Sequence, residues 1–425
     1  FMAGKFTKTE KSWMMYDWAN SAYSILAASI LPIFAGVVAE RAGVDSVRHA
    51  SDWAWAVSIS ALIIAVLAPI LGATGDYKGM RMRMFIGFVL LGTIATGLLP
   101  LVGFYPAFLL LFAVTNLAFA GANVYYDSFL IDVTTRERMD KVSSWGFALG
   151  YIGGSTIPFV ASIALYMLSS DGMIPLLPFD SVTAMKIACA ITAVWWLVFS
   201  IPFIKNVKQV SFIERDGHVV RDSIKRTLSS FKEFTHDKAL FRFFIAYFCY
   251  INGVGAIIMM ASKLADTIGI GALYIIGGLF LTQIVAFPCS ILYDKLGERF
   301  GHKNMILVGI ATYIVVSIVG FFMYEGWQFL LLACLVGTAQ GGIQALSRSY
   351  FGKLIPDKKR AGEYFGFYNI FGKFESVVGT MLMAIVLMFS RDVHYGVIPV
   401  LVLFLIGGAL MIKVPGDRAL LKEVE

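Results

Sequence analysis

Long apolar stretches alternate with short polar loops along almost the whole chain. A helix that crosses the hydrocarbon core of a bilayer needs about 20 mostly apolar residues, and about twelve stretches reach that length. They run over residues 13–38, 53–73, 84–103, 106–130, 143–168, 183–203, 240–261, 268–291, 304–324, 327–350, 364–389 and 395–413. The pattern predicts an all-α integral membrane protein with twelve transmembrane helices.

The composition supports the bilayer as the main solvent of this chain. Of its 425 residues, 58% are hydrophobic and 15% are charged, whereas soluble domains carry about 25% charged residues. The formal net charge of +7 raises the question of a nucleic-acid partner. The basic residues form no soluble domain with interleaved aromatic side chains, so we expect no nucleic-acid binding.

Basic residues collect in one set of loops. They follow the second, fourth, eighth and tenth predicted helices, as Lys78, Arg81, Arg83, Arg136, Arg138, Lys141, Lys295, Arg299, Lys303, Lys353, Lys358, Lys359 and Arg360. The opposite loops offer only Arg41, Arg48, Lys263 and Arg391. Because Lys and Arg are enriched in cytoplasmic loops, this asymmetry places both termini in the cytoplasm.

A long polar insertion divides the predicted helices into six and six. We therefore expect an N-terminal bundle over residues 1–204, a cytoplasmic linker over 205–239 and a C-terminal bundle over 240–425. Two readings of the linker remain open. Residues 222–234 form an amphipathic helix on the membrane surface, or the whole segment is a solvated connection.

The two halves repeat similar short sequences at a nearly constant offset of about 220 residues. The loop after the second helix contains Gly72, Asp76, Gly79 and Arg81, and the loop after the eighth contains Ser290, Asp294, Lys295 and Gly297. The fourth and tenth helices end in Asp127-Ser-Phe and Arg348-Ser-Tyr, and the next helices open in Trp145-Gly-Phe and Phe365-Gly-Phe. This repetition indicates a duplicated six-helix unit, as in many secondary transporters.

The paired Gly-x-x-x-Asp-x-x-Gly loops resemble the signature of the major facilitator superfamily between its second and third helices. There are two departures: Tyr77 stands where the superfamily has a basic residue, and Ser290 replaces the first Gly of the second copy. The resemblance implies the major facilitator fold, with two pseudo-symmetric six-helix bundles, over the whole chain.

Two further segments resemble the autophagy-type vacuolar amino-acid effluxers and their bacterial relatives. They are Tyr16-Asp-Trp-Ala-Asn-Ser21 in the first helix and Gly146-Phe-Ala-Leu-Gly-Tyr-Ile-Gly-Gly154 in the fifth. The resemblance implies amino-acid export for fungal members and leaves the substrate of bacterial members open. It also implies a multi-pass protein of the bacterial inner membrane.

The superfamily resemblance assigns a role to the paired loops. It implies that Asp76 meets the start of the eleventh helix and Asp294 the start of the fifth. An aspartate at a helix N-terminus is stabilised by the unpaired N–H groups and the helix dipole. Both contacts would join the halves, so the loops would latch the cytoplasmic side shut. The alternative is a plain turn with a solvated aspartate.

Ionisable and amide side chains fall mainly on helices that, in this superfamily, face a central cavity. Polar groups within membrane spans are costly and usually line a wet path or bind one another. The candidates for substrate or proton contact are Asp17, Asn20, Tyr23, Asn123, Asp127, Tyr250, Asn252, Gln283, Gln344, Arg348, Lys373 and Glu375. Asn116, Tyr126, Tyr247, Gln340 and Asn369 accompany them.

Asp127 and Arg348 hold equivalent positions in the two repeats, near the cytoplasmic ends of their helices. We expect an ion pair between the bundles, with Asp17 at nearly the same depth. Such a pair loses solvation on closing and exchanges partners on opening, or else it is a static link.

Lys373 and Glu375 fall roughly 15–18 Å into the eleventh helix at 1.5 Å per residue. Their spacing of two directs them to different faces of the helix. Glu375 is the first candidate for a protonatable site, because burial raises the pKa of a carboxyl group, and Asp17 is the second. The alternative is a pair of structural ion contacts with neighbouring helices.

The sequence therefore predicts a monomeric secondary transporter that moves a small polar solute by alternating access, with protons as the candidate coupling ion. Carboxylates together with Lys373 and Arg348 suit a zwitterionic amino acid. A sugar, a peptide or an amphipathic drug is the alternative solute, and a membrane receptor without transport is the remote one. No nucleophile–base pair, metal-ligand cluster or phosphate loop is present in the sequence, so we expect no enzyme activity, no metal and no cofactor. The expected partners are the solute, protons and membrane lipids.

Overall fold

The computed structural model describes residues 6–214, 218–374, 378–390 and 392–416. Regular structure in these ranges is helical, and one isolated backbone bridge joins Tyr77 to Ile213. In the described part, 11 helical stretches are long and apolar enough to cross a membrane. The remaining predicted span, 364–389, corresponds to two helices on either side of residues 375–377, which lie outside the described ranges. The chain is an all-α, multi-pass integral membrane protein.

The first half of the chain contains α1 to α8. Their bounds are Lys8–Arg41 for α1, Ser46–Gly75 for α2, Met80–Leu98 for α3, Tyr105–Ser128 for α4, Leu130–Val133 for α5, Met139–Leu149 for α6, Ile157–Leu168 for α7 and Ser181–Asn206 for α8. A π-helical segment, Gly150–Thr156, joins α6 to α7. Short 3₁₀ turns occupy Leu99–Leu101 and Arg136–Arg138. We call α1 to α8 the N-terminal bundle.

The second half begins with a connecting helix. Its bounds are Val219–His236 for α9, Lys238–Thr267 for α10, Ala272–Phe300 for α11, His302–Phe321 for α12, Gly326–Leu354 for α13, Ala361–Phe374 for α14, Val378–Phe389 for α15 and Val397–Ile412 for α16. Short 3₁₀ turns cover Lys358–Arg360 and Val393–Gly396. We call α10 to α16 the C-terminal bundle.

Local sequence sets where several helices begin. The Thr7 hydroxyl accepts a hydrogen bond from the Glu10 amide, and the Glu10 carboxylate accepts one from the Thr7 amide, which closes a capping box at the start of α1. Asp45 and Asp180 cap α2 and α8 through their side chains. Gly79 precedes α3 with φ of 71°, a left-handed conformation that costs a residue with a Cβ atom roughly 1–2 kcal/mol.

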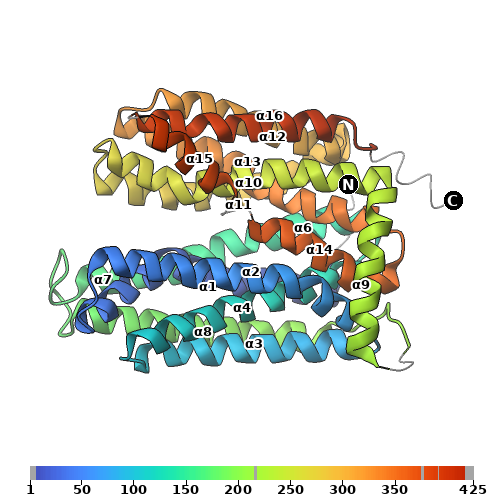
Figure 1. Ribbon diagram of the computed structural model, residues 1–425, viewed down its shortest axis with the longest axis horizontal. Coiled ribbons are helices and arrows are strands. Elements are labelled where there is room, and N and C mark those ends of the chain that lie inside the picture. The colour runs from blue at the N-terminus through green and yellow to red at the C-terminus, as the bar shows by residue number, and fades with distance from the viewer. Residues whose placement is uncertain (1–5, 215–217, 375–377, 391, 417–425) are drawn as a thin grey trace.

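The two bundles lie side by side, and α9 runs across one end of both (Figure 1). Within the N-terminal bundle α1 packs on α8 and α3 on α4; within the C-terminal bundle α11 packs on α13 and α10 on α16. The bundles meet where α2 packs against α14 and where α6 packs against α11 and α13. We call the end beside α9 the α9 end.

Candidate functional site

A cavity of about 430 Å³ lies between the two bundles. Its walls come from α1, α4, α6, α10, α11, α13 and α14, so both halves of the chain contribute. Seven of the twelve candidates for substrate or proton contact line it: Asp17, Asn20, Asn123, Asp127, Gln283, Gln344 and Arg348. Of the accompanying residues, Tyr126, Tyr247, Gln340 and Asn369 line it as well. Its volume falls in the range of about 300–1,000 Å³ typical of pockets for small ligands.

Arg348 of α13 bridges two carboxylates at the side of the cavity nearest the α9 end. Its Nη2 atom lies 2.9 Å from Asp17 Oδ2, and its Nη1 atom lies 3.3 Å from Asp127 Oδ1. Asn369 of α14 donates to the other oxygen of Asp127 at 3.1 Å. The guanidinium fork suits this double contact, since it presents several N–H groups in one plane. Because Asp17 and Asp127 belong to the N-terminal bundle, the cluster joins the two bundles.

The rest of the Arg348 side chain is enclosed by polar and aromatic groups. Its Nε atom donates to Ser143 Oγ at 3.0 Å, and its Nη2 atom donates to the Ser143 carbonyl at 3.2 Å. The guanidinium carbon lies 4.7 Å from the Trp13 ring, 5.3 Å from Tyr126 and 4.3 Å from Phe147. Cation–π contacts of this kind strengthen when water is excluded. Of these groups, the sequence pattern singled out Tyr126 but not Ser143, Trp13 or Phe147 as contacts of the cluster.

The two segments that carried the family resemblance pack against each other. A methyl group at Gly146 would overlap Asp17 Oδ2, and one at Gly154 would lie 2.5 Å from the Trp18 carbonyl. Ser21, one turn further along α1, bonds the Asp17 carbonyl at 2.7 Å. Gly146 therefore leaves room for the Asp17 carboxylate beside Arg348, and a Cβ atom there would displace that carboxylate.

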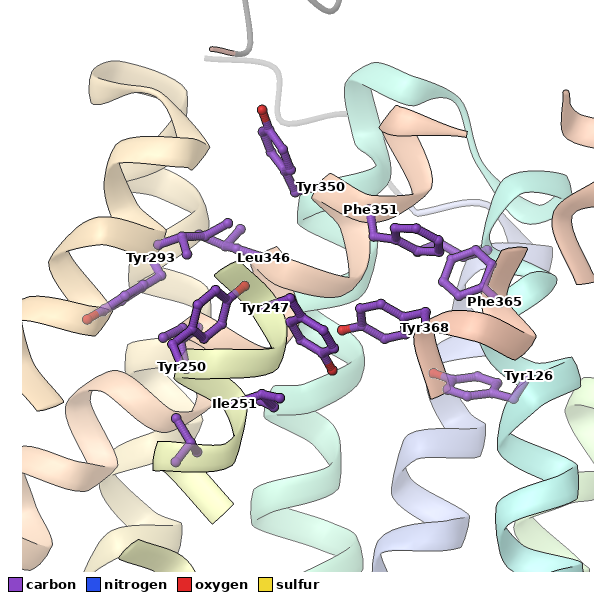
Figure 2. Close-up of a cluster of buried hydrophobic side chains, with 14 of the residues drawn as sticks. Tyr126, Tyr247, Tyr250, Ile251, Tyr293, Leu346, Tyr350, Phe351, Phe365 and Tyr368 are labelled. Carbon is purple, nitrogen blue, oxygen red and sulfur yellow. The ribbon is translucent and has the colours of Figure 1, made fainter. Parts of the chain in front are cut away.

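Aromatic side chains form the cavity wall on the C-terminal side. The Tyr247 and Tyr368 rings stack with centroids 4.5 Å apart, and Phe351 stacks on Tyr368 at 4.9 Å. Figure 2 shows Tyr368 of α14 between Tyr247 of α10 and Tyr126 of α4. Tyr247, Tyr368 and Tyr126 all line the cavity, so aromatic faces and hydroxyls accompany the charged cluster.

Three predicted residues lie away from the cavity lining. Tyr23 is buried against Thr115, with the two hydroxyl oxygens 2.7 Å apart. Tyr250 is buried against Ser347 in the same way. Asn252 is buried and donates to the Phe248 carbonyl of its own helix. These groups are bound inside single bundles, because hydropathy places a residue on a helix without fixing which way the helix faces.

Two other predicted side chains belong to the end of α14 and the residues after it. Glu375 lies outside the described residues, and so does the side chain of Lys373, whose backbone belongs to the last turn of α14. Their roles in substrate or proton contact stay predictions.

Asp76 sits at the N-terminus of α14 and joins the bundles at the α9 end. Its two carboxylate oxygens accept from the Gly362 amide at 2.7 Å and from the Glu363 amide at 3.1 Å. Arg81 holds the same carboxylate at 2.9 Å and Asp132 at 2.9 Å. Asp76 and Arg81 are fully buried. A carboxylate in this position pairs the free N–H groups at a helix start.

Gly72 permits this contact. A Cβ atom added to Gly72 would overlap the Gly362 carbonyl, because α2 and α14 touch through their backbones there. The contact and the Asp76 hydrogen bonds lie one turn apart on α2. We call this group, with Gly72, Asp76, Arg81, Gly362 and Glu363, the Asp76 latch.

Arg226 of α9 completes the Asp76 latch and was not expected from the sequence. Its guanidinium lies 3.0 Å from Glu363 Oε2 and 3.3 Å from Asp76 Oδ2, and it stacks over the Tyr77 ring at 5.3 Å. Tyr77 is the residue that departs from the superfamily signature. Helix α9 of the linker thus supplies a second positive charge beside Asp76, in addition to Arg81. In the sequence, only the amphipathic pattern of the linker indicated that this segment forms a helix.

The second copy of the loop makes a different contact. Asp294 of α11 lies 3.4 Å from His302 Nε2, and His302 Nδ1 lies 3.2 Å from Asp140 of α6. Asp140 also binds Ser349 and Lys353 of α13. A side chain at Gly297 would meet the His302 ring, and Lys295 is exposed. Asp294 therefore reaches the start of α6 through His302, whereas Asp76 bonds the start of α14 directly.

Within the described ranges, no group of three His, Cys, Asp or Glu residues is arranged to hold a metal ion.

Comparisons with known proteins agree with this arrangement. Residues 131–423 match the model of the family described as vacuole effluxer Atg22 like. The MFS-type transporter YxiO of Bacillus subtilis (strain 168) is 44% identical over 424 residues, which cover 98% of this chain and 97% of YxiO. Autophagy-related protein 22 of Yarrowia lipolytica (strain CLIB 122 / E 150) is 25% identical over 67% of this chain and 52% of its own length.

A solved structure supports the fold. The major facilitator transporter FucP, in an outward conformation, superposes with a TM-score of 0.73 at 14% identity, covering 96% of this chain and 98% of FucP. Two helical bundles around a shared polar cavity, together with these matches, define a transporter of the major facilitator superfamily, and not an enzyme. Within that class, the chain belongs to the Atg22-like vacuole effluxer family.

Proposed function

We propose that this transporter carries a small zwitterionic solute, an amino acid, through the cavity between the bundles. The observation that supports the proposal is the cluster of Asp17, Asp127 and Arg348 on the cavity wall. An ammonium group can replace the guanidinium beside a carboxylate, and a carboxylate can take the freed guanidinium fork. The family is described as vacuole effluxers, which supports solute transport and leaves the solute to be identified by experiment.

Binding would exchange partners within the cluster rather than add an isolated charge. Arg348 already binds two carboxylates, so a solute that carries both charges leaves the net charge of the cavity unchanged. The cluster holds two carboxylates and one guanidinium, so an anionic solute would increase its excess of negative charge, which is costly in a low-dielectric site. This logic favours a zwitterion over a simple anion, and the flux screen below distinguishes a zwitterion from a cation.

Alternating access follows from where the bundles touch. The Asp76 latch, the Asp140 contacts and the Arg348 cluster all join the bundles between the cavity and the α9 end. We infer that this conformation is closed at the α9 end and that its cavity is reached from the opposite end. By the distribution of Lys and Arg, we place the α9 end and both termini in the cytoplasm of a bacterial cell.

An amphipathic solute is the second candidate, and one observation favours it. An apolar chamber of about 120 Å³ lies inside the C-terminal bundle. It shares Ile258, Gln283 and Gln340 with the central cavity. A solute with a charged head in the cavity and an apolar tail in the chamber would satisfy both surfaces.

Purified protein tests the two candidates directly. Amino acids, sugars, peptides and amphipathic cations would be screened by thermal shift, because a ligand that binds the folded form raises its apparent stability. Each hit would then be measured for counterflow in proteoliposomes. The proposal predicts saturable amino-acid flux that Arg348→Lys abolishes. Flux of sugars or amphipathic cations alone would overturn it.

We propose proton exchange at Asp17 or Glu375 as the coupling step. The test imposes a pH gradient across the same proteoliposomes and measures accumulation of the solute. Coupling predicts accumulation that collapses when a protonophore is added. If the gradient changes neither rate nor accumulation, proton coupling is wrong, while the solute assignment is still judged by counterflow.

A further inference from the structure

Helix α9 presents two different faces. Ser223, Arg226 and Ser230 face the protein, where Ser223 and Ser230 are fully buried and Arg226 binds the Asp76 latch. The opposite side carries Val220, Ile224 and Leu228, which are 62%, 41% and 72% exposed, with exposed Arg221 and Lys225 beside them. We call these last five residues the outer face of α9.

The spacing of the outer face is that of one helical stripe. Val220, Ile224 and Leu228 recur every four residues, so their side chains lie above one another along the helix. Large apolar side chains in water are costly, and a stripe with basic residues beside it is typical of helices that lie in the membrane interface. The composition of the outer face therefore suits a bilayer surface.

The contacts of α9 with α2 place it at the level where the membrane-spanning part of α2 ends, which agrees with a position at the bilayer surface. Thr227 Oγ1 approaches the Pro69 carbonyl at 3.5 Å, and Arg226 donates to the Ala73 carbonyl. Both carbonyls belong to the last two turns of the membrane-spanning α2, just after its exposed apolar residue Leu67. Since α9 runs across the helices of the bundles, it lies along the membrane plane at this height (Figure 1).

We propose that the outer face of α9 binds the surface of an anionic bilayer, and that this binding holds the Asp76 latch closed. Arg221 and Lys225 would bind anionic lipid headgroups, and Val220, Ile224 and Leu228 would enter the interface. The basic residues of the outer face favour an anionic bilayer, because its negative surface potential attracts Lys and Arg, whereas a zwitterionic surface has no net charge.

The link to the latch is geometric. Arg226 holds Asp76 of α2 and Glu363 of α14 at once, which is possible only while the two bundles meet at the α9 end. Arg360, which precedes α14, also binds Ser230 of α9. A lipid surface that fixes α9 in this place therefore favours the closed state, because it binds that state more tightly than the open one.

Spin labels measure the population of the closed state. Exposed Arg83 of α3 and Lys359 before α14 lie on different bundles at the α9 end, and both would be replaced by labelled cysteine in protein whose native cysteines are replaced. Distances would be recorded in vesicles of phosphatidylcholine with and without phosphatidylglycerol. The distance between the labels is measured without a solute. Its response to phosphatidylglycerol therefore tests this proposal separately from the proposed function.

The expected result is a shift toward the short distance when phosphatidylglycerol is present, with the closed-to-open ratio rising by up to about thirtyfold for two basic residues near the surface. R221Q combined with K225Q should remove that shift. The matched control, K8Q combined with K11Q, removes the same charge from exposed residues at the start of α1 and should keep it. The proposal is overturned if wild type does not respond to the lipid, or if both double variants respond alike.

A nitroxide at Leu228 tests the position of the stripe. In the vesicles it should collide with oxygen more than with a water-soluble nickel chelate, as for residues in the interface, while a nitroxide at exposed Lys359 should show the reverse. Equal access of the chelate to both positions would place the outer face in water, as for a solvated linker or a surface for a soluble protein, and would overturn the proposal.

Discussion

Arg348 Nη2 lies 2.9 Å from Asp17 Oδ2, although 331 residues separate them in the chain. The two residues belong to different bundles, and Gly146 provides the space in which they meet. A charge pair that spans both bundles at the wall of the cavity connects solute binding to the relative position of the bundles. The predictions below follow from this relationship and from the latch beyond it.

Removing the guanidinium of Arg348 should destabilise the protein. R348Q would leave Asp17 and Asp127 buried without their partner, which costs about 3–5 kcal/mol for a broken buried pair. Thermal unfolding in detergent should therefore begin at a markedly lower temperature. R242Q, which removes an exposed guanidinium from α10, is the control and should unfold like wild type. Equal unfolding temperatures for R348Q and wild type would show that the pair carries no net stabilisation.

A methyl group at Gly146 should separate the pair without changing any charge. The added Cβ atom would overlap Asp17 Oδ2 and approach Arg348 Nη2 to 3.2 Å. We expect G146A to lower solute flux by about tenfold or more, because a misplacement near 1 Å can cost that much or more in a preorganised site. G87A adds the same methyl group to α3 where nothing lies within 4 Å, and its flux should match wild type. Normal flux in G146A would contradict the assigned role of the pair.

The two glycines of the first loop should behave differently. In G72A the new methyl group overlaps the Gly362 carbonyl, so the bundles cannot meet at the α9 end, and the distance between labels at positions 83 and 359 should lengthen. In G79A no neighbour lies within 4 Å, but the left-handed backbone is strained by roughly 1–2 kcal/mol. That variant should unfold at a lower temperature and keep the short distance. Equal distances between the two labels in G72A and G79A would contradict this prediction.

Asp76 and Arg226 should act as one unit. D76N, R226Q and the double variant form a cycle in which the closed-to-open ratio is measured with the same labels. Residues in direct contact within an ion network usually couple by about 0.5–3 kcal/mol. We expect each single change to favour the open state and the double change to add little more. If the effects of D76N and R226Q on the closed-to-open ratio are strictly additive, Arg226 does not stabilise the closed state through Asp76.

Hydropathy predicted the membrane spans but not their polar ends. The predicted span 53–73 corresponds to α2 over Ser46–Gly75, because the first turns of that helix are polar and capped by Asp45. Length and apolarity report the part of a helix inside the hydrocarbon core, whereas caps set the ends.

The repeat predicted part of the site. Equivalent positions in the two halves indicated the Asp127–Arg348 pair, and the structure places these residues 3.3 Å apart. Nothing in the repeat indicated that Arg348 would lie closer to Asp17, or that Arg226 would join Asp76, since these contacts depend on tertiary packing. Tyr250 and Asn252 were predicted beside the cavity and lie elsewhere, because α10 is apolar on most sides and its rotation is set by its neighbours.

The central claim is that the bundles must separate at the α9 end for a solute to pass. Met139 of α6 and Gly352 of α13 provide the test, because a Cβ atom at Gly352 would lie 2.7 Å from Met139 Sδ across the two bundles. Flux would be measured for M139C combined with G352C, in protein whose native cysteines are replaced, before and after oxidation. The account predicts that the cross-link stops flux and that reduction restores it; undiminished flux through fully cross-linked protein would contradict it.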